Sequence, residues 1–341
     1  MTKGLSFRIS GDLGDLCYQC AILAALPGPH TLLCVDRPGL TAQFTPRVPL
    51  LKPMLLAQAY IGSVECSEDK PDIDLTGFRR FHSATTTLIA ANAAECGMQM
   101  MLESPPDGSA PWLTAQPNQS FAGKIIIARS PRYNNLWFPW RQIVEHYGHR
   151  LLFVGLPDEH RAFIAAFGHV THLQIKDYLE LAQTIAGAGL FIGNQSSPHA
   201  VAMGLGVTII QETCLQQPDC IFRRDNVQYV TDGACHLPDI AGSGSLEIGS
   251  TYVAQDNGNR SIVPPGLWQY PGLPPSTHFS IQVELVKTLE KCSAADADNL
   301  LYAHNAQRHP EFFANTTNDP FLMSKIAYNN TFGAPKPSTQ P

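Results

Sequence analysis

Short apolar runs alternate with segments of helical periodicity over most of the chain. Five compact runs have the composition of buried parallel strands: residues 31–36, 124–128, 151–154, 190–192 and 207–210. Between such runs, apolar residues recur every three or four positions, as they do over residues 178–186. Strands that alternate with helices predict an α/β fold with parallel sheets.

A stretch rich in proline and glycine, residues 102–122, interrupts this alternation, and we interpret it as a linker. A chain of 341 residues is long enough for two domains, each with its own core. We therefore predict one Rossmann-like domain over residues 1–115 and a second over residues 116–235. Residues 236–341 predict an irregular C-terminal extension with a helix over residues 279–291 and a tail rich in Asn, Thr and Pro.

Composition and charge narrow the class of protein. The net charge of -6 argues against a general nucleic-acid or anionic-membrane surface. The sequence has no apolar run of the roughly 18 residues that a membrane span needs and no signal-peptide core at its start. Its 9 cysteines lie mostly in apolar segments, which is typical of buried thiols in a reducing cytoplasm, and we predict a cytoplasmic protein.

Cys17 and Cys20 form a C-x-x-C without a second pair, so we assign them to helix packing, with a metal or redox role as the alternative.

The first candidate site is a glycine turn near the N-terminus. It joins a strand over residues 5–10 to a helix. Gly11 and Gly14 permit backbone conformations that other residues avoid and allow a ligand to approach closely. Asp12 and Asp15 lie at the mouth of the turn, where a carboxylate can also cap the helix that follows.

The second candidate site is the turn over residues 193–199 (GNQSSPH), which follows an apolar strand and precedes a helix of small residues. Ser196 and Ser197 are residue types that cap helices, and Pro198 suits a first helical turn. Free backbone N–H groups at such a turn attract anions, so we predict a phosphate-bearing ligand. An ordinary strand-to-helix connection that binds nothing is the alternative.

The loop after residues 124–128 carries Arg129 and Arg132 among polar and aromatic side chains. Guanidinium groups bind diphosphates in a fork geometry, and aromatic rings supply stacking surfaces. In the alternative interpretation the loop is solvated, and Trp137 and Trp140 anchor the next helix in the core.

Acidic residues follow the next strand of this half. Asp158 and Glu159 come directly after the loop that ends residues 151–154. An acidic side chain at such a strand end, here Glu159, can accept hydrogen bonds from ribose hydroxyls. Both carboxylates would also favour the N-terminus of the helix that begins there.

Together the two turns resemble motifs of glycosyltransferase family 9, the lipopolysaccharide heptosyltransferase group. Residues 14–23 (GDLCYQCAIL) are similar to its N-terminal Gly-Asp motif and following helix. Residues 193–202 (GNQSSPHAVA) are similar to its Asp-Ser/Thr-Gly-x-x-His-x-x-Ala loop. The resemblance covers residues 5–230 and implies the GT-B fold, in which two Rossmann-like domains face each other across a cleft that holds the active site.

The resemblance implies a glycosyltransferase that moves a sugar from a nucleotide-sugar donor to an acceptor hydroxyl, in an inverting reaction without a metal or other cofactor. It implies that Asp15 is the general base. The residues that the resemblance and the loop chemistry assign to the donor phosphates are Gly14, Arg129, Arg132, Asn194, Gln195, Ser196, Ser197 and His199, with Glu159 at the ribose or base.

The second turn also departs from the family's pattern. Asn194 stands where the family carries Asp, and Ser196 where it carries Gly; in the first motif Gln19 and Cys20 replace Leu-Pro. These departures motivate the alternative of a catalytically decayed binding or scaffold protein. A sugar-nucleotide epimerase, which shares the fold, is a further alternative. The donor sugar stays open, as does the acceptor, for which a glycan, a lipid-linked glycan, a protein side chain and a modified nucleobase are all chemically reasonable.

Overall fold

The computed structural model describes residues 4–36, 43–81, 86–98, 105–135, 138–214, 218–222, 224–230, 234–248, 252–256 and 259–263. The helix predicted over residues 279–291, the tail after it and Trp137 lie outside these ranges.

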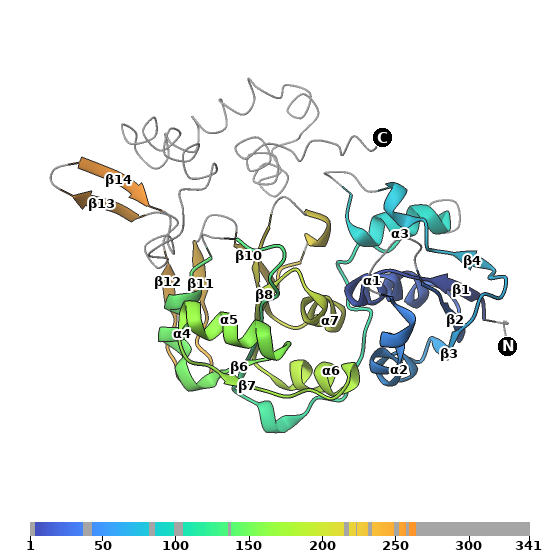
Figure 1. Ribbon diagram of the computed structural model, residues 1–341, viewed down its shortest axis with the longest axis horizontal. Helices are drawn as coiled ribbons and strands as arrows, with labels where there is room; N and C mark the ends of the chain where they lie inside the picture. The colour runs from blue at the N-terminus through green and yellow to red at the C-terminus, as the bar shows by residue number, and fades with distance from the viewer. Residues whose placement is uncertain are drawn as a thin grey trace, which may run out of the picture.

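The N-terminal half is built on a four-stranded parallel sheet of order β3-β2-β1-β4 (Figure 1). Its strands are β1 (Ser6–Ile9), β2 (His30–Cys34), β3 (Ile61–Cys66) and β4 (Ile73–Asp74). Its helices are α1 (Leu13–Ala24), α2 (Val48–Leu56) and α3 (Leu88–Cys96). Because the strands are parallel, the chain must cross back over the sheet between them. Helix α1 makes this crossover between β1 and β2 and α2 makes it between β2 and β3, whereas residues 67–72 join β3 to β4 without a helix.

The second half is a six-stranded parallel sheet of order β10-β9-β8-β5-β6-β7. Its strands are β5 (Ile125–Ala128), β6 (Leu151–Phe153), β7 (Thr171–His172), β8 (Leu190–Asn194), β9 (Ile209–Glu212) and β10 (Val227–Val230). Its helices are α4 (Trp140–Tyr147), α5 (Pro157–Phe167), α6 (Tyr178–Gly187) and α7 (Ser197–Leu205). Every residue of the central strands β5 and β8 is buried, which explains why these strands read as unbroken apolar runs.

The two halves pack through helices. In Figure 1, α1 lies beside α7 and α2 beside α6, between the two sheets. A Cβ atom on Gly14 would lie 3.6 Å from the Cα of Ser197, so the two helices approach closely where their first turns meet. One apolar core runs across this contact, with Leu16 on one side and Ala200 on the other. The predicted arrangement of two Rossmann-like units is therefore confirmed, and the units meet face to face.

The segment predicted as a linker is packed between these helices. The indole N–H of Trp112 donates to the carbonyl oxygen of Cys17 at 2.6 Å, and its backbone N–H donates to that of Gly204 at 2.9 Å. The segment thus contacts α1 and α7 together. The boundary that we predict between residues 115 and 116 lies within this segment, after Trp112.

Two antiparallel hairpins lie in the described part of the predicted irregular extension. The strands are β11 (Cys235–Leu237) with β12 (Leu246–Ile248), and β13 (Tyr252–Asp256) with β14 (Asn259–Val263). Cys235 and Leu237 are buried in the same apolar cluster as Tyr147 of α4. Strands of 3 residues are too short to show an alternating pattern, which is why the sequence did not predict the first hairpin. Among the described helices, none has the length and apolarity that a membrane crossing requires.

Candidate active site

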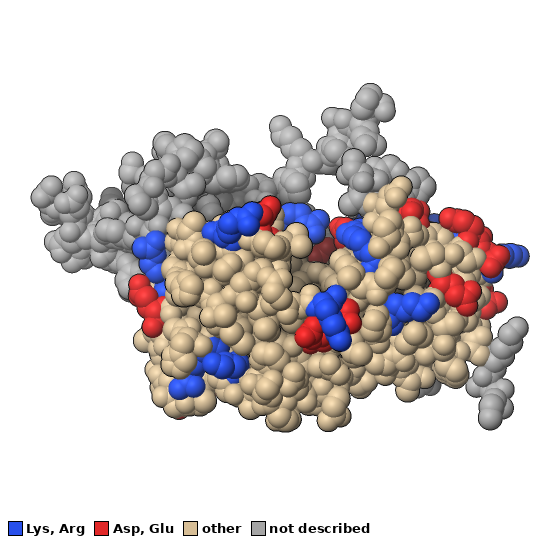
Figure 2. Space-filling model, turned by 60° about the horizontal axis from the view of Figure 1, so that its bottom comes forward, with Lys and Arg blue, Asp and Glu red and all other residues tan. Residues whose placement is uncertain are grey.

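A pocket of about 460 Å³ opens between the two halves of the molecule. Figure 2 shows the surface hollowed there, with basic side chains on both sides of the hollow and acidic atoms inside it. Its walls include the N-terminal turns of α1 and α7 and the loops after β5 and β6. Each of these segments follows the carboxyl end of a parallel strand, where open α/β sheets bind their ligands.

The structure brings most of the predicted site residues to this one pocket. Its lining includes Gly14, Asp15, Arg129, Arg132, Glu159, Gln195, Ser196 and Ser197. Two predicted residues, Asn194 and His199, are fully buried and lie outside the pocket lining.

Asp15 occupies the third position of α1, and its side chain is almost fully buried. Its Oδ2 atom accepts a hydrogen bond from the backbone N–H of Asp12 at 2.9 Å and forms an ion pair with Arg79 at 2.5 Å. Its Oδ1 atom has no donor among the described residues. Burial raises the pKa of the Asp15 carboxyl above its usual range, and the positive charge of Arg79 offsets part of that rise.

Gly11 makes room for this carboxylate. Its φ of 134° is one that residues with a side chain rarely adopt. A Cβ atom at this position would lie 2.5 Å from the Oδ2 atom of Asp15. The glycine that the sequence placed in the first turn is thus required by the carboxylate rather than by a ligand.

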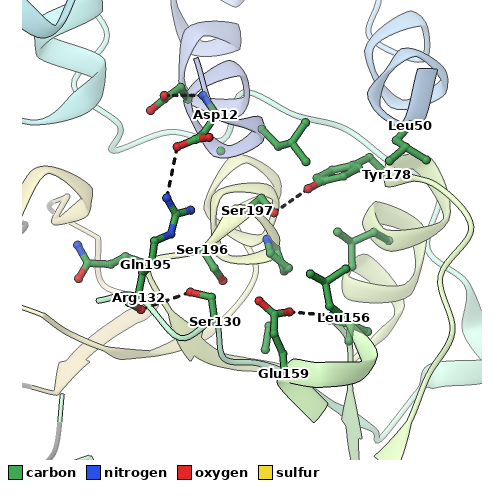
Figure 3. Close-up of a pocket in the computed structure, with 18 of the residues that line it drawn as sticks. Asp12, Leu50, Ser130, Arg132, Leu156, Glu159, Tyr178, Gln195, Ser196 and Ser197 are labelled. Atoms are coloured by element: carbon green, nitrogen blue, oxygen red, sulfur yellow. Dashed lines mark hydrogen bonds and ion pairs between the residues drawn. The ribbon is translucent and has the colours of Figure 1, made fainter. Parts of the chain in front are cut away.

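The carboxylate of Asp12 forms ion pairs with two arginines at the mouth of the pocket. Arg132 reaches across from the second half to within 3.4 Å of it, as Figure 3 shows, and Arg47 comes from the first half to within 3.8 Å. The side chains of Asp12 and Arg132 are 42% and 59% exposed, so both pairs are solvated and exchange easily with an anionic ligand.

Lys176 is the other exposed cation of the pocket lining. Its ammonium group has no ion pair or hydrogen bond with another described residue. Its charge is therefore available to a ligand.

Arg129 is paired inside the protein. Its guanidinium forms a two-pronged contact with Glu212, at 2.9 Å from Nε to Oε2 and 3.1 Å from Nη2 to Oε1. The fully buried Glu212 carboxylate also accepts hydrogen bonds from the backbone of Asn135 and the indole of Trp140, each at 2.8 Å. This cluster ties the loop after β5 to the end of β9. Trp140 is fully buried, as the alternative interpretation of this loop predicted.

The N-terminus of α7 faces the pocket with unsatisfied donors. Ser196 occupies the cap position, but its hydroxyl donates back to the carbonyl of Asn194 at 3.2 Å and does not cap the helix, in contrast to the prediction. The backbone N–H groups of Ser197 and His199 have no acceptor among the described residues, and Pro198 has no N–H. The hydroxyl of Tyr178 donates to that of Ser197 at 2.6 Å (Figure 3). These groups form the anion-attracting end of a helix.

The His199 side chain lies beneath this end, inside the core. Its Nδ1 atom lies 3.3 Å from the hydroxyl of Tyr18 on α1. Burial lowers the pKa of His199 to about 4, so the imidazole is neutral near pH 7. A neutral, buried ring cannot supply positive charge to a phosphate. The backbone N–H of His199, in contrast to its ring, points out of the N-terminal end of α7.

Glu159 lines the pocket from the first turn of α5. Its Oε2 atom accepts the backbone N–H of Leu156 at 2.8 Å, so it caps the helix as the alternative interpretation predicted (Figure 3). Asp158 pairs with Arg161 on the surface and does not line the pocket.

Several pocket residues were not predicted from the sequence: Arg47, Arg79, Lys176 and Tyr178. Arg79 lies in a short 3₁₀ turn (Phe78–Phe81) without a recognisable motif. A helical pattern predicted that Tyr178 would begin a helix, but no signal marked it as a pocket residue. In the described part of the chain, no three His, Cys, Asp or Glu side chains converge as metal ligands. Cys17 and Cys20 are buried in the core along α1.

The sequence matches no protein-family model and no curated protein. Among solved structures, it is similar to the ADP-heptose lipopolysaccharide heptosyltransferase II of E. coli, with 12% identity and a TM-score of 0.46 over 70% of this chain and 92% of that one. It is also similar to the E. coli heptosyltransferase WaaC with ADP-2-deoxy-2-fluoro heptose, with 13% identity and a TM-score of 0.45 over 70% and 93% of the two chains. A glycosyltransferase family 9 protein from Veillonella parvula DSM 2008 matches with 12% identity and a TM-score of 0.43 over 62% and 80%.

Proposed function

We propose that the protein is a glycosyltransferase that moves a sugar from a nucleotide-sugar donor to an acceptor hydroxyl. One observation carries this proposal: a single pocket places a buried carboxylate with a free oxygen on one wall and a helix N-terminus with free N–H groups on the other. The carboxylate suits proton removal from an alcohol, and the helix end suits a diphosphate. Both requirements of sugar transfer from a nucleotide donor are met in one place.

Asp15 acts as the general base through its Oδ1 atom. Oδ2 is held by Arg79 and by the backbone of Asp12, so the side chain is fixed while Oδ1 stays open to the acceptor. The acceptor oxygen bonds to the anomeric carbon as the bond from that carbon to the phosphate oxygen breaks, and the acceptor proton passes to Asp15. In this proposal the acceptor attacks from the side of Asp15 and the diphosphate leaves toward the N-terminus of α7, so the reaction inverts the anomeric carbon.

The departing diphosphate collects negative charge, which the second half of the pocket stabilises. Ser197 lines the pocket and offers its N–H and hydroxyl to these oxygens, and the N–H of His199 lies in the same first turn of α7. Lys176 and Arg132 supply positive charge from exposed positions around it. These groups would stabilise the negative charge that a divalent cation stabilises in metal-dependent transferases. In this proposal Arg129 shapes the loop through Glu212, and the second oxygen of Glu159 accepts from the donor ribose.

A panel of nucleotide sugars tests the proposed function. The purified protein is incubated with ADP-, UDP-, GDP- and CMP-activated sugars without an acceptor, and release of the free nucleotide is followed by chromatography. We expect slow hydrolysis of one donor, since water can replace the acceptor at Asp15. A decayed scaffold would release no nucleotide from any donor. An epimerase would change the sugar while the nucleotide stays attached, and either outcome would overturn the transferase.

The pair between Arg79 and Asp15 predicts a pH effect. Transfer requires the ionised carboxylate, so activity falls as pH drops through the pKa of Asp15. The positive charge of Arg79 lowers this pKa, so Arg79→Met raises it and moves the acid limb of the pH–rate profile to higher pH. The measurement is kcat/KM against pH with the donor found in the panel.

Arg80→Met is the matched control for this prediction. Arg80 is the next residue and forms an ion pair with Glu95 at 2.9 Å, away from the base. Its removal should leave the acid limb in place. If both variants keep the profile of the unmodified protein, Arg79 does not set the pKa of the base.

A further inference from the structure

Asn194, at the end of β8, has a side chain whose hydrogen bonds all go to one neighbouring loop. Strand β8 pairs with β5, so Asn194 lies directly below the loop that follows β5. Its Oδ1 atom accepts the backbone N–H of Ser130 at 3.1 Å. Its Nδ2 atom donates to the carbonyl oxygens of Ser130 at 3.0 Å and Arg132 at 2.6 Å, and lies 3.1 Å from Oδ1 of Asn134. The amide thus fastens three residues of the loop from a fully buried position.

An aspartate could keep the contact with the N–H of Ser130 but not the contacts made by Nδ2. Oxygen acceptors surround the Nδ2 atom, and a carboxylate oxygen in its place would have no proton to offer them. The substitution would also bury a negative charge against carbonyl oxygens, which costs far more than the loss of one hydrogen bond. Asparagine at this position therefore fits the loop as it is folded in this chain.

The loop needs such support because its backbone is strained. Tyr133 has a φ of 57°, in the left-handed region that aromatic residues seldom occupy. The carbonyl that Asn194 holds belongs to Arg132, so the contact fixes the peptide group directly before the strained residue. From this backbone, Arg132 reaches Asp12 on the other half, and both Arg132 and Tyr133 line the pocket.

We propose that Asn194 is a positioning residue that holds residues 130–134 so that Arg132 and Tyr133 face the donor diphosphate. This inference rests on the proposed function for the identity of the ligand, while the fastening of the loop stands independently of it. Asn194 never touches the ligand in this account, because it is buried below the loop. Its replacement of the acidic residue found in the resembling motif is then an adaptation to this loop and not a sign of lost activity.

Asn194→Asp tests the proposal against the control Asn226→Asp. Asn226 also donates two hydrogen bonds from its amide to carbonyl oxygens, those of Gly206 and Val207, at the far end of α7. Hydrogen–deuterium exchange reports on the loop peptide, and calorimetric titration with ADP and UDP reports on the site. We expect Asn194→Asp to speed exchange in the loop and to weaken nucleotide binding about tenfold or more. Asn226→Asp should do neither, even where it lowers the melting temperature as much.

Arg132→Gln completes a double-mutant cycle. Because Asn194 acts in part through Arg132, Asn194→Asp will cost less nucleotide affinity in the Arg132→Gln background than in the unmodified protein, whereas a general structural defect would cost the same in both. Unchanged loop exchange in Asn194→Asp, or fully additive losses of affinity, would overturn the proposal. If Asn194→Asp does not fold, Asn134→Ala removes one acceptor of the same amide and should loosen the loop to a smaller degree. If neither ADP nor UDP binds the unmodified protein, the choice of ligand fails, and the exchange data still decide whether Asn194 holds the loop.

Discussion

Replacing Asp15 with asparagine is expected to lower kcat for sugar transfer by about 10²- to 10⁴-fold, the range that general base catalysis contributes. The amide cannot take up the acceptor proton, whereas its oxygen can still accept the N–H of Asp12. The fold should survive because the Arg79 side chain is 34% exposed and water can solvate its charge once its partner is neutral. Donor binding should change little, since the helix end that we assign to the diphosphate lies on the other wall.

Asp12→Asn is the matched control for this loss. Asp12 lies three residues away in the same turn, but its carboxylate is 42% exposed and pairs with Arg47 and Arg132. We expect its replacement to reduce kcat by about tenfold at most, as for the loss of solvated ion pairs. Steady-state kinetics with the donor found in the panel, together with a melting curve for each variant, make the comparison. An Asp15→Asn protein that folds and transfers sugar at the full rate would exclude Asp15 as the base.

The arrangement of the two halves could be predicted because its causes are local. Central strands such as β5 and β8 are covered on both faces, and continuous apolar sequence is the direct result. In a parallel sheet all strand ends that lead into helices lie on one edge. The turns that contain Asp15 and Ser197 therefore had to lie at the open edges of their sheets. The resemblance implied a cleft shared by the two edges, which the apolar pattern alone did not. The contact between α1 and α7 is what brings these edges to one pocket.

The partners of the site residues could not be predicted, because they come from distant parts of the chain. Arg79 reaches Asp15 from 64 positions away, and Glu212 reaches Arg129 from 83. Neither distance leaves a periodic signal in the sequence. For His199, the burial of the side chain could not be predicted either. Its position in a motif indicated a ligand, but the close contact of α1 and α7 turns its ring into the core, where burial decides its charge.

Replacing Glu212 with alanine is expected to destabilise the fold by about 3–5 kcal/mol, the cost of breaking a buried ion pair by removing one partner. The Arg129 side chain is 16% exposed, so its charge would lose its counterion with little water to replace it. The backbone N–H of Asn135 and the indole N–H of Trp140 would lose the acceptor that holds them at 2.8 Å. Urea unfolding followed by tryptophan fluorescence measures the change.

Asp158→Ala is the control for this prediction, because its pair with Arg161 lies on the surface and its loss should change stability by about 0.5 kcal/mol or less. The double substitution Arg129→Met with Glu212→Leu removes both buried charges and should recover the part of the lost stability that comes from the unpaired Arg129, while the N–H groups of Asn135 and Trp140 still lack an acceptor. A Glu212→Ala protein as stable as Asp158→Ala would contradict a structural role for the pair. The double variant also separates two roles for Arg129. If the affinity for the nucleoside diphosphate is unchanged, Arg129 has a structural role only. If a stable double variant loses binding, Arg129 contacts the donor, as we predicted from the sequence.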